Sequence, residues 1–256
     1  CKHLKSAIPS DALHAKGIII GYDARHNSQR FAEITANVML AAKIPTKLFR
    51  QIVPTPYVPF GLRHFGCVAG VMVTASHNPK QDNGYKVYWM NGAQLIPPHD
   101  KGIADAILDS LEPEESSWTH QDGCVDPYDE ITREFFASLK CEVRLPAAKT
   151  DLKMVYTAMH GVGTEFTQMS LDTFGVAKDC VFLVDEQCTP DPEFPTVAFP
   201  NPEEGKSSLD LSFKKADAVG ARLILANDPD ADRLAVAEKT GDKWRVFNGN
   251  QIGALL

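Results

Sequence analysis

Residues 71–86 read Val71-Met72-Val73-Thr74-Ala75-Ser76-His77-Asn78-Pro79-Lys80-Gln81-Asp82-Asn83-Gly84-Tyr85-Lys86, and this stretch decides the fold of the chain. An apolar run is followed by a polar loop and by a second strand-like run that continues to Trp89. Ser76 is a hydroxyl in a loop that leaves a buried strand, and His77 and Lys80 lie beside it. The Asn-Gly pair at 83–84 turns the chain so that the side chain of Lys86 can point back toward the loop. A serine placed in this way can carry a covalent phosphoryl group, and the alternative is an ordinary solvated turn.

A second polar loop follows an apolar strand later in the chain, where residues 227–233 read Asn-Asp-Pro-Asp-Ala-Asp-Arg. Asp228, Asp230 and Asp232 at a spacing of two can converge on one Mg²⁺ ion, which keeps positions open for phosphate oxygens. A calcium EF-hand loop starts similarly, but it needs Gly where this chain has Arg233 and Glu where it has Lys239. The structural alternative is a solvated acidic turn. Three crowded carboxylates repel one another, however, unless a cation neutralises them.

The segments around both loops predict two sets of alternating strands and helices. Each loop follows the third strand of its set, which indicates an internal structural repeat. In the first set, Ser28 and Thr55 are predicted to cap helices, and the Asn-Gly pair at 91–92 predicts a hairpin. The expected strands of this set are 16–22, 46–49, 68–73, 85–89 and 93–96, followed by a helix around residues 103–111 and another at 132–139. The expected elements of the second set are strands 152–156, 181–184, 223–226, 234–238 and 244–247, with helices at 163–174, 206–219 and from about 250.

These patterns predict an α/β protein with two consecutive three-layer domains of similar topology, each built on a mixed sheet. We expect the first domain, with the serine loop, at 1–146 and the second, with the aspartate loop, at 147–256. Open α/β sheets bind their ligands at the carboxyl ends of parallel strands, where both loops are predicted to lie. If the two domains face each other, Ser76 and the three aspartates can meet at one site.

The two loops together resemble those of the α-D-phosphohexomutase superfamily. Its phosphoserine loop reads like residues 74–79, and its magnesium loop has the Asp-x-Asp-x-Asp-Arg form seen at 228–233. The resemblance covers nearly the whole chain and is closer to one branch, the second-type phosphoglucomutases, also called phosphopentomutases. The runs that carry this closer resemblance are 76–89, 91–94, 99–101 and 227–239.

The resemblance implies a sugar-phosphate mutase that works through a phosphoserine and a sugar bisphosphate intermediate. Ser76 would carry the phosphoryl group. Mg²⁺ would take one oxygen from that group and one from each aspartate of the loop. A sugar bisphosphate would be the activating phosphoryl donor, and the substrates would be small sugar phosphates. Lys86 matches the position of the general acid and base, and a cation beside a metal has a lowered pKa.

The remaining candidate residues would bind phosphate or orient the nucleophile. His77 would orient the serine or bind phosphate, and Lys80 would bind phosphate. Arg233 follows the metal loop and could stabilise the transferring phosphoryl group, with a surface salt bridge as its alternative. His160 follows a buried strand in a motif that also matches the family, and a structural loop role is its alternative.

Two rival functions remain open at this point. In a phosphatase of the haloacid dehalogenase type, an apolar strand precedes Asp-x-Asp and Asp228 would be the nucleophile. That family expects Thr or Val two residues after the second aspartate, whereas this chain has Asp232, which favours a metal ligand. The other rival is a noncatalytic sugar-phosphate-binding relic. The retained Ser76 and the complete aspartate triad argue against it.

Composition limits the partners. A net charge of −7 over 256 residues argues against binding to nucleic acid. Six cysteines without a C-x-x-C pair predict reduced thiols and a cytoplasmic protein. The sequence contains no run of 18 apolar residues, so we expect no membrane span. We also expect a monomer. Because the chain opens with Cys1 and stops within a predicted helix, we expect a fragment that is inactive alone and lacks the loops that select the sugar.

Overall fold

A computed structural model describes residues 1–113, 115–142, 150–203 and 208–256. These residues form two compact units, and each is described here by itself. The predicted boundary at 146 and 147 lies outside the described residues, so it stays a prediction. The first unit comprises Cys1–Tyr22, Asn27–Thr74 and Asn83–Phe135, and the second comprises Asp23–His26, Ala75–Asp82 and Phe136–Leu256.

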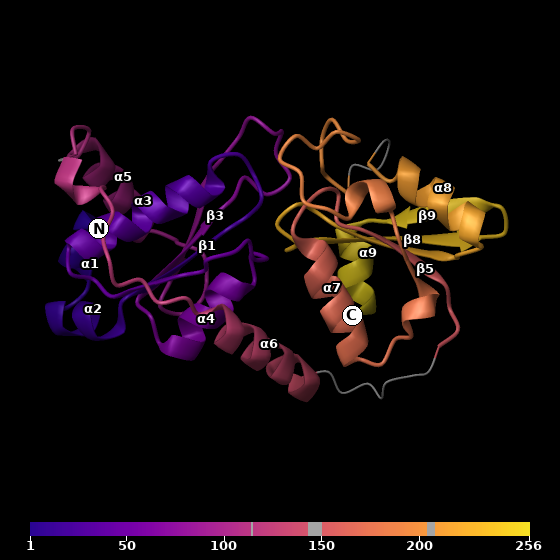
Figure 1. The fold of residues 1–256 in the computed structure, drawn as a ribbon, viewed down its shortest axis with the longest axis horizontal. Coiled ribbons are helices and arrows are strands. Elements are labelled where there is room, and N and C mark those ends of the chain that lie inside the picture. Colours follow the sequence, from indigo (N-terminus) through magenta and orange to yellow (C-terminus); the bar gives the residue numbers. More distant parts are fainter. Residues whose placement is uncertain (114, 143–149, 204–207) are drawn as a thin grey trace. The chain divides into compact units, whose positions relative to one another are not determined.

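The first unit is built on a four-stranded sheet with the order β2-β1-β3-β4. The first three strands in the chain are parallel and the fourth is antiparallel. Figure 1 shows β1 and β3 between the helices α3 and α4. They are β1 (Ile18–Tyr22), β2 (Thr46–Leu48), β3 (Ala69–Val73) and β4 (Tyr85–Trp89). The helices that begin in this unit are α1 (Lys2–Ala7), α2 (Ser10–Lys16), α3 (Ser28–Ala41), α4 (Tyr57–Phe65), α5 (His99–Leu108) and α6 (Tyr128–Glu142), with a short 3₁₀ turn, η1 (Glu115–Ser117).

The central strand β1 is buried along its whole length because helices cover both faces of the sheet. Ile18 and Ile20 belong to the same core cluster as Ala36 of α3. Ile19 points the other way, toward α4, where a Cβ added at Gly61 would lie 2.6 Å from its Cδ1. Three isoleucines in a row therefore serve both faces, which explains why the strand reads as a continuous apolar run rather than an alternating one.

The second unit repeats this plan with one more strand, in the order β6-β5-β7-β8-β9. Its strands are β5 (Met154–Thr157), β6 (Val181–Leu183), β7 (Leu223–Asn227), β8 (Leu234–Thr240) and β9 (Lys243–Phe247). Its helices are α7 (Gly163–Thr173), α8 (Asp210–Val219) and α9 (Gly249–Leu255), with 3₁₀ turns η2 (Lys178–Cys180) and η3 (Asp185–Gln187). Again three parallel strands precede antiparallel ones, which confirms the predicted fold class.

Three local predictions are wrong. Helix α3 begins at Ser28 itself, with Asn27 at the N-cap, because the buried Ser28 hydroxyl accepts a hydrogen bond from Asn83 Nδ2 (3.1 Å). Helix α4 begins at Tyr57, with Pro56 rather than Thr55 at the N-cap. The hairpin turn at 91–92 forms, with hydrogen bonds from Trp89 N to Ala93 O and from Leu95 N to Val87 O (both 3.0 Å), but the arm predicted as a strand at 93–96 is reduced to a bridge between Tyr88 and Gln94. The prolines at 97 and 98 have no N–H to extend the ladder.

Two further observations concern the class of protein. All six cysteines are free thiols. Within the described ranges, no helix combines the length and the apolar character that a membrane crossing requires.

Candidate active site

The serine loop leaves the carboxyl end of β3, and its backbone is held in a tight conformation. Ser76 has a φ of 53°, which is in the left-handed region that non-glycine residues seldom adopt. Two turns close the loop, with hydrogen bonds from Asn78 N to Ala75 O (3.0 Å) and from Asp82 N to Pro79 O (3.1 Å). A strained non-glycine residue persists only where its surroundings hold it, and such residues cluster at functional sites.

The aspartate loop leaves the carboxyl end of β7 in the corresponding position of the second sheet. Asp228 and Asp230 are fully buried, whereas Asp232 is exposed. One oxygen of each carboxylate lies within 4.8 Å of the others. Three carboxylates at this separation, two of them removed from water, are the donor set of a hard divalent cation, so the residues fit Mg²⁺.

Hydrogen bonds join the two ends of the aspartate loop. Asp228 Oδ1 accepts a hydrogen bond from Arg233 N (3.0 Å), and Asn227 Nδ2 donates to Arg233 O (2.6 Å). The Asn227 side chain is itself fixed by the hydroxyl of Tyr156, which donates to Oδ1 (2.9 Å). The loop is thereby anchored to β5, the strand that pairs with β7 in the sheet.

Without a cation, the aspartates destabilise one another's charge. Burial, together with the charges of Asp230 and Asp232, raises the pKa of Asp228 to about 8. A carboxyl group with this pKa is mostly protonated near neutral pH. A bound divalent cation would reverse the effect because it favours the ionised form.

We expect the metal-free protein to lose stability as the pH rises from about 4 to about 8. The folded pKa of Asp228 lies above the unfolded one, so the folded state binds the extra proton, and its contribution is complete only below the unfolded pKa. The measurement is Tm at pH 5.5 and pH 8 in a chelator. The fall in Tm should be smaller in Asp228→Asn and with saturating Mg²⁺. An equal fall in the variant would show that other groups cause it.

The serine and aspartate loops belong to the same compact unit, and they meet there. Ser76 Oγ donates a hydrogen bond to Asp228 Oδ2 at 3.2 Å. A phosphoryl group on that oxygen would bring about −1.5 to −2 charge to the carboxylates, which again calls for a cation between them. The arrangement places the hydroxyl that is predicted to be the nucleophile directly beside the loop that is predicted to bind the cation.

The aspartate loop rests on the backbone of the connection after β5. Val162 N donates a hydrogen bond to Pro229 O at 2.9 Å. Gly161 lies so close that an added Cβ would be 2.3 Å from Pro229 Cα and 2.4 Å from Pro229 O. Because these are backbone atoms, they cannot move aside without moving the loop.

Gly161→Ala should therefore displace the aspartate loop. We expect a loss of about 1–3 kcal/mol in the free energy of unfolding, as in other overpacked sites. Mg²⁺ affinity should fall as well. Gly253→Ala is the matched control because nothing lies within 4 Å of the Cβ it adds. The measurements are denaturant unfolding and Mg²⁺ titration. Wild-type Mg²⁺ affinity in Gly161→Ala would contradict the role given to this contact.

Two basic residues, Lys80 of the serine loop and His26 of the connection after β1, both contact Glu193 in the second unit. Lys80 Nζ lies 2.6 Å from Glu193 Oε2, and His26 Nε2 lies 2.5 Å from Glu193 Oε1. Hydrogen bonds from Lys80 and His26 lower the pKa of Glu193. The His77 ring packs edge-on against Phe199, with 6.0 Å between centroids. Lys80 is thus paired with a carboxylate here, and its predicted phosphate role stays a prediction.

His160 lies in the connection after β5, and Arg233 lies at the end of the aspartate loop. The buried His160 has its Nε2 2.8 Å from Thr196 Oγ1, and burial lowers its pKa. These contacts suit the structural alternative given above. Arg233 Nη1 lies 3.8 Å from Glu203 Oε2, and its Nε lies 4.0 Å from Asp228 Oδ2, so its guanidinium is beside the metal loop. The phosphate roles of His160 and Arg233 stay predictions.

Lys86 is the second residue of β4, in the first unit. It is paired in the antiparallel register with Met72 of β3 and is partly exposed. Its predicted acid–base role stays a prediction.

Sequence reasoning missed Arg25 and Glu193. Arg25 is buried in the connection after β1, and its guanidinium reaches into the serine loop. A signal was present, since Asp23 and Arg25 follow a buried strand at the edge of the sheet where ligands bind. Glu193 lies in an irregular segment, and no local pattern marks it.

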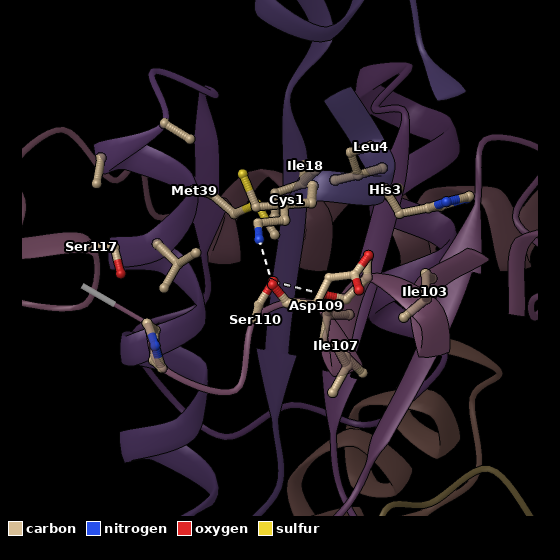
Figure 2. A pocket seen from close by; sticks show the side chains of 18 of the residues that line it. Cys1, His3, Leu4, Ile18, Met39, Ile103, Ile107, Asp109, Ser110 and Ser117 are labelled. Atoms are coloured by element: carbon tan, nitrogen blue, oxygen red, sulfur yellow. Dashed lines mark hydrogen bonds between the residues drawn. The ribbon is translucent and has the colours of Figure 1, made fainter. Parts of the chain in front are cut away.

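The first unit also contains a cavity of about 1050 Å³. It lies between the sheet and the helices α1, α3 and α5, and Figure 2 shows that its lining combines apolar residues with polar ones: Leu4, Ile18, Met39, Ile103 and Ile107 with His3, Asp109, Ser110 and Ser117. None of the predicted site residues, all of which lie in the described ranges, lines this cavity.

Comparisons with known proteins support the assignment of the two loops to two domains of one family. Residues 3–114 match the family model for phosphoglucomutase/phosphomannomutase, alpha/beta/alpha domain I. Residues 133–241 match the model for alpha/beta/alpha domain II of the same family.

The relatives include a phosphopentomutase from Homo sapiens, which is 50% identical over 272 aligned residues that cover 100% of this chain and 44% of the relative. A human glucose 1,6-bisphosphate synthase is 46% identical over 94% of this chain and 41% of its own length. The chain therefore spans less than half the length of these relatives. A crystal structure of a phosphoglucomutase/phosphomannomutase family protein from Burkholderia thailandensis has the same fold, with a TM-score of 0.69 and 22% identity over 92% of this chain and 50% of that one.

Proposed function

The chain belongs to the α-D-phosphohexomutase superfamily, and from this premise we propose that it is the nucleophile- and metal-binding part of a sugar-phosphate mutase. The reaction interconverts a sugar 1-phosphate with a pentose 5-phosphate or a hexose 6-phosphate. The observation that carries the proposal is the hydrogen bond of 3.2 Å between Ser76 Oγ and Asp228 Oδ2, which joins the predicted phosphoserine to the predicted metal loop.

Each turnover contains two phosphoryl transfers. In the first, the Oγ–P bond of phosphorylated Ser76 breaks as a sugar hydroxyl forms a new O–P bond, and a base accepts the hydroxyl proton. The sugar then carries two phosphates. After it reorients, Ser76 Oγ attacks the other phosphate, and the departing sugar oxygen receives a proton. The chain is thereby phosphorylated again.

The residues of this chain divide these tasks. Ser76 is the nucleophile and the leaving group. Asp228, Asp230 and Asp232 would hold Mg²⁺, which draws electron density from the transferring phosphoryl group. Lys86 is proposed as the acid and base, His77 orients the serine, and Arg233, Lys80 and His160 bind phosphate. A sugar bisphosphate supplies the phosphoryl group to an unphosphorylated serine.

Two observations bear on the substrate class. The human phosphopentomutase matches the whole chain, which favours pentose phosphates. The human glucose 1,6-bisphosphate synthase matches nearly as well, so a hexose phosphate is the other candidate. We propose pentose 1-phosphates as the preferred substrates and a cytoplasmic, monomeric enzyme.

The test is a coupled assay of the full-length protein. Ribose 1-phosphate, deoxyribose 1-phosphate and glucose 1-phosphate are supplied in parallel, with Mg²⁺ and a catalytic amount of glucose 1,6-bisphosphate. We expect interconversion in all three reactions and the highest kcat/KM with the pentoses. Release of inorganic phosphate without isomerisation would favour the haloacid dehalogenase alternative. Binding without any turnover would favour the noncatalytic relic.

A further inference from the structure

Arg25 lies inside the serine loop, and its guanidinium is surrounded by the loop's backbone. Its side chain is 1% exposed. Nη2 donates to Ser76 O (2.7 Å) and Asn78 O (2.6 Å), and Nη1 donates to Pro79 O (2.8 Å) and to Asp82 O (3.4 Å). Four carbonyl groups of one loop therefore converge on a single side chain that comes from a different connection.

The remaining contacts fix the arginine itself. Its Nε lies 3.3 Å from Asp23 Oδ2, and its backbone N–H donates to Asp23 Oδ1 at 3.1 Å. Its guanidinium lies over the ring of Phe194, 5.0 Å from the centroid. Asp23, two residues earlier in the chain, thus contacts both the side chain and the backbone of Arg25. The guanidinium group that binds the serine loop therefore has little conformational freedom.

The bond to Ser76 O bears directly on the nucleophile. Ser76 is held at a φ of 53°, a conformation that costs a non-glycine residue free energy and needs external support. The carbonyl of Ser76 itself is bound to Arg25, so this contact fixes the peptide that follows the strained residue. The direction of Oγ depends on the backbone that carries it.

We propose that Arg25 is a positioning residue that sets the conformation of the serine loop and thereby aims Ser76 for phosphoryl transfer. It touches no reacting atom, and it acts through the loop backbone. Its effect on turnover rests on the proposed function, whereas its effect on loop conformation does not. Lysine cannot replace it, because an ammonium group offers three donors from one atom and not a planar fork.

The test compares Arg25→Lys and Arg25→Ala with the wild type in the full-length protein. Amide hydrogen exchange across residues 75–82 should be at least about tenfold faster in Arg25→Lys, and the change should be confined to that loop. With a sugar 1-phosphate, kcat should fall about 100-fold, as expected when a reacting group is misplaced by about 1 Å, while KM changes little. Guanidinium ion added to Arg25→Ala should restore part of kcat.

Arg30→Ala is the matched control, because Arg30 is an exposed arginine on the helix that follows the same connection. It should leave exchange and kcat unchanged. Unchanged exchange in Arg25→Lys would overturn the proposal, and so would faster exchange at full kcat. If Arg25→Ala does not fold, Arg25→Lys decides. If the wild type lacks mutase activity, the proposed function fails and the exchange measurement still tests the positioning role.

Discussion

Ser76→Ala is expected to abolish mutase activity in the full-length protein, with kcat reduced at least about 10⁴-fold, as when other enzymes lose their nucleophile. The reason is that alanine removes the only atom of this side chain that can form and break the bond to phosphorus. The fold should be unaffected, because the Ser76 backbone contact to Arg25 does not involve the hydroxyl. The measurement is steady-state kinetics with a sugar 1-phosphate and its bisphosphate donor.

The chemical identity of the phosphorylated residue gives an independent check. After incubation with the bisphosphate, mass spectrometry of the wild type should locate an acid-stable phosphate on Ser76. Ser10→Ala is the control, because Ser10 is exposed in α2, in the other compact unit. A hydroxylamine-sensitive phosphate on Asp228, with Ser76→Ala still active, would favour the haloacid dehalogenase alternative.

Asp230→Asn should lower activity strongly and yet stabilise the metal-free protein. Asp230 is fully buried beside Asp228, so neutralising it removes a predicted ligand of the cation and also a repulsion between like charges. We expect kcat to fall about 10²–10³-fold, as when a single transition-state contact is lost. Mg²⁺ affinity should fall by at least about 100-fold.

The stability of the metal-free Asp230→Asn protein should rise while its activity falls. This combination distinguishes the loss of a cation ligand from misfolding of the variant. In a chelator at pH 8, Tm of Asp230→Asn should exceed that of the wild type by about 2–4 °C for each kcal/mol of repulsion removed. Asp242→Asn is the matched control, because Asp242 is an exposed acid in the turn between β8 and β9. Wild-type activity and Mg²⁺ dependence in Asp230→Asn would show that the three aspartates form only an acidic turn.

The two units use the same structural arrangement to support their chemical loops. In each sheet, the loop after the third strand in the chain carries the residues predicted to perform the chemistry, and the connection after the first strand contacts that loop. Arg25 binds carbonyls of the serine loop, whereas Val162 donates to Pro229 of the aspartate loop. The two units therefore share the contact between the first connection and the third-strand loop as well as the sheet topology, although different residues make the contact.

The sequence by itself determined the strands and the chemical character of both loops. Residues 18–22 are buried throughout and residues 223–226 form an apolar run that is buried at every second position, and these patterns are local enough to read from the chain. The polar residues that follow each run identify a nucleophile and a cation site, since Ser76 and the three aspartates are the residue types those roles require. Their roles stay predictions.

Only the tertiary structure decided which groups meet. Arg25 lies 51 residues before Ser76, and Asp228 lies 152 residues after it, so the contacts among them depend on strand order and not on spacing in the chain. The same reason explains the error at Ser28, whose hydroxyl binds the distant Asn83, whereas the short arm at residues 93–96 follows from the adjacent prolines. Gly161 reads as an ordinary loop glycine until Pro229 is packed against it. Local periodicity reports burial, but close approach between segments is set by long-range packing, which no short stretch of sequence contains.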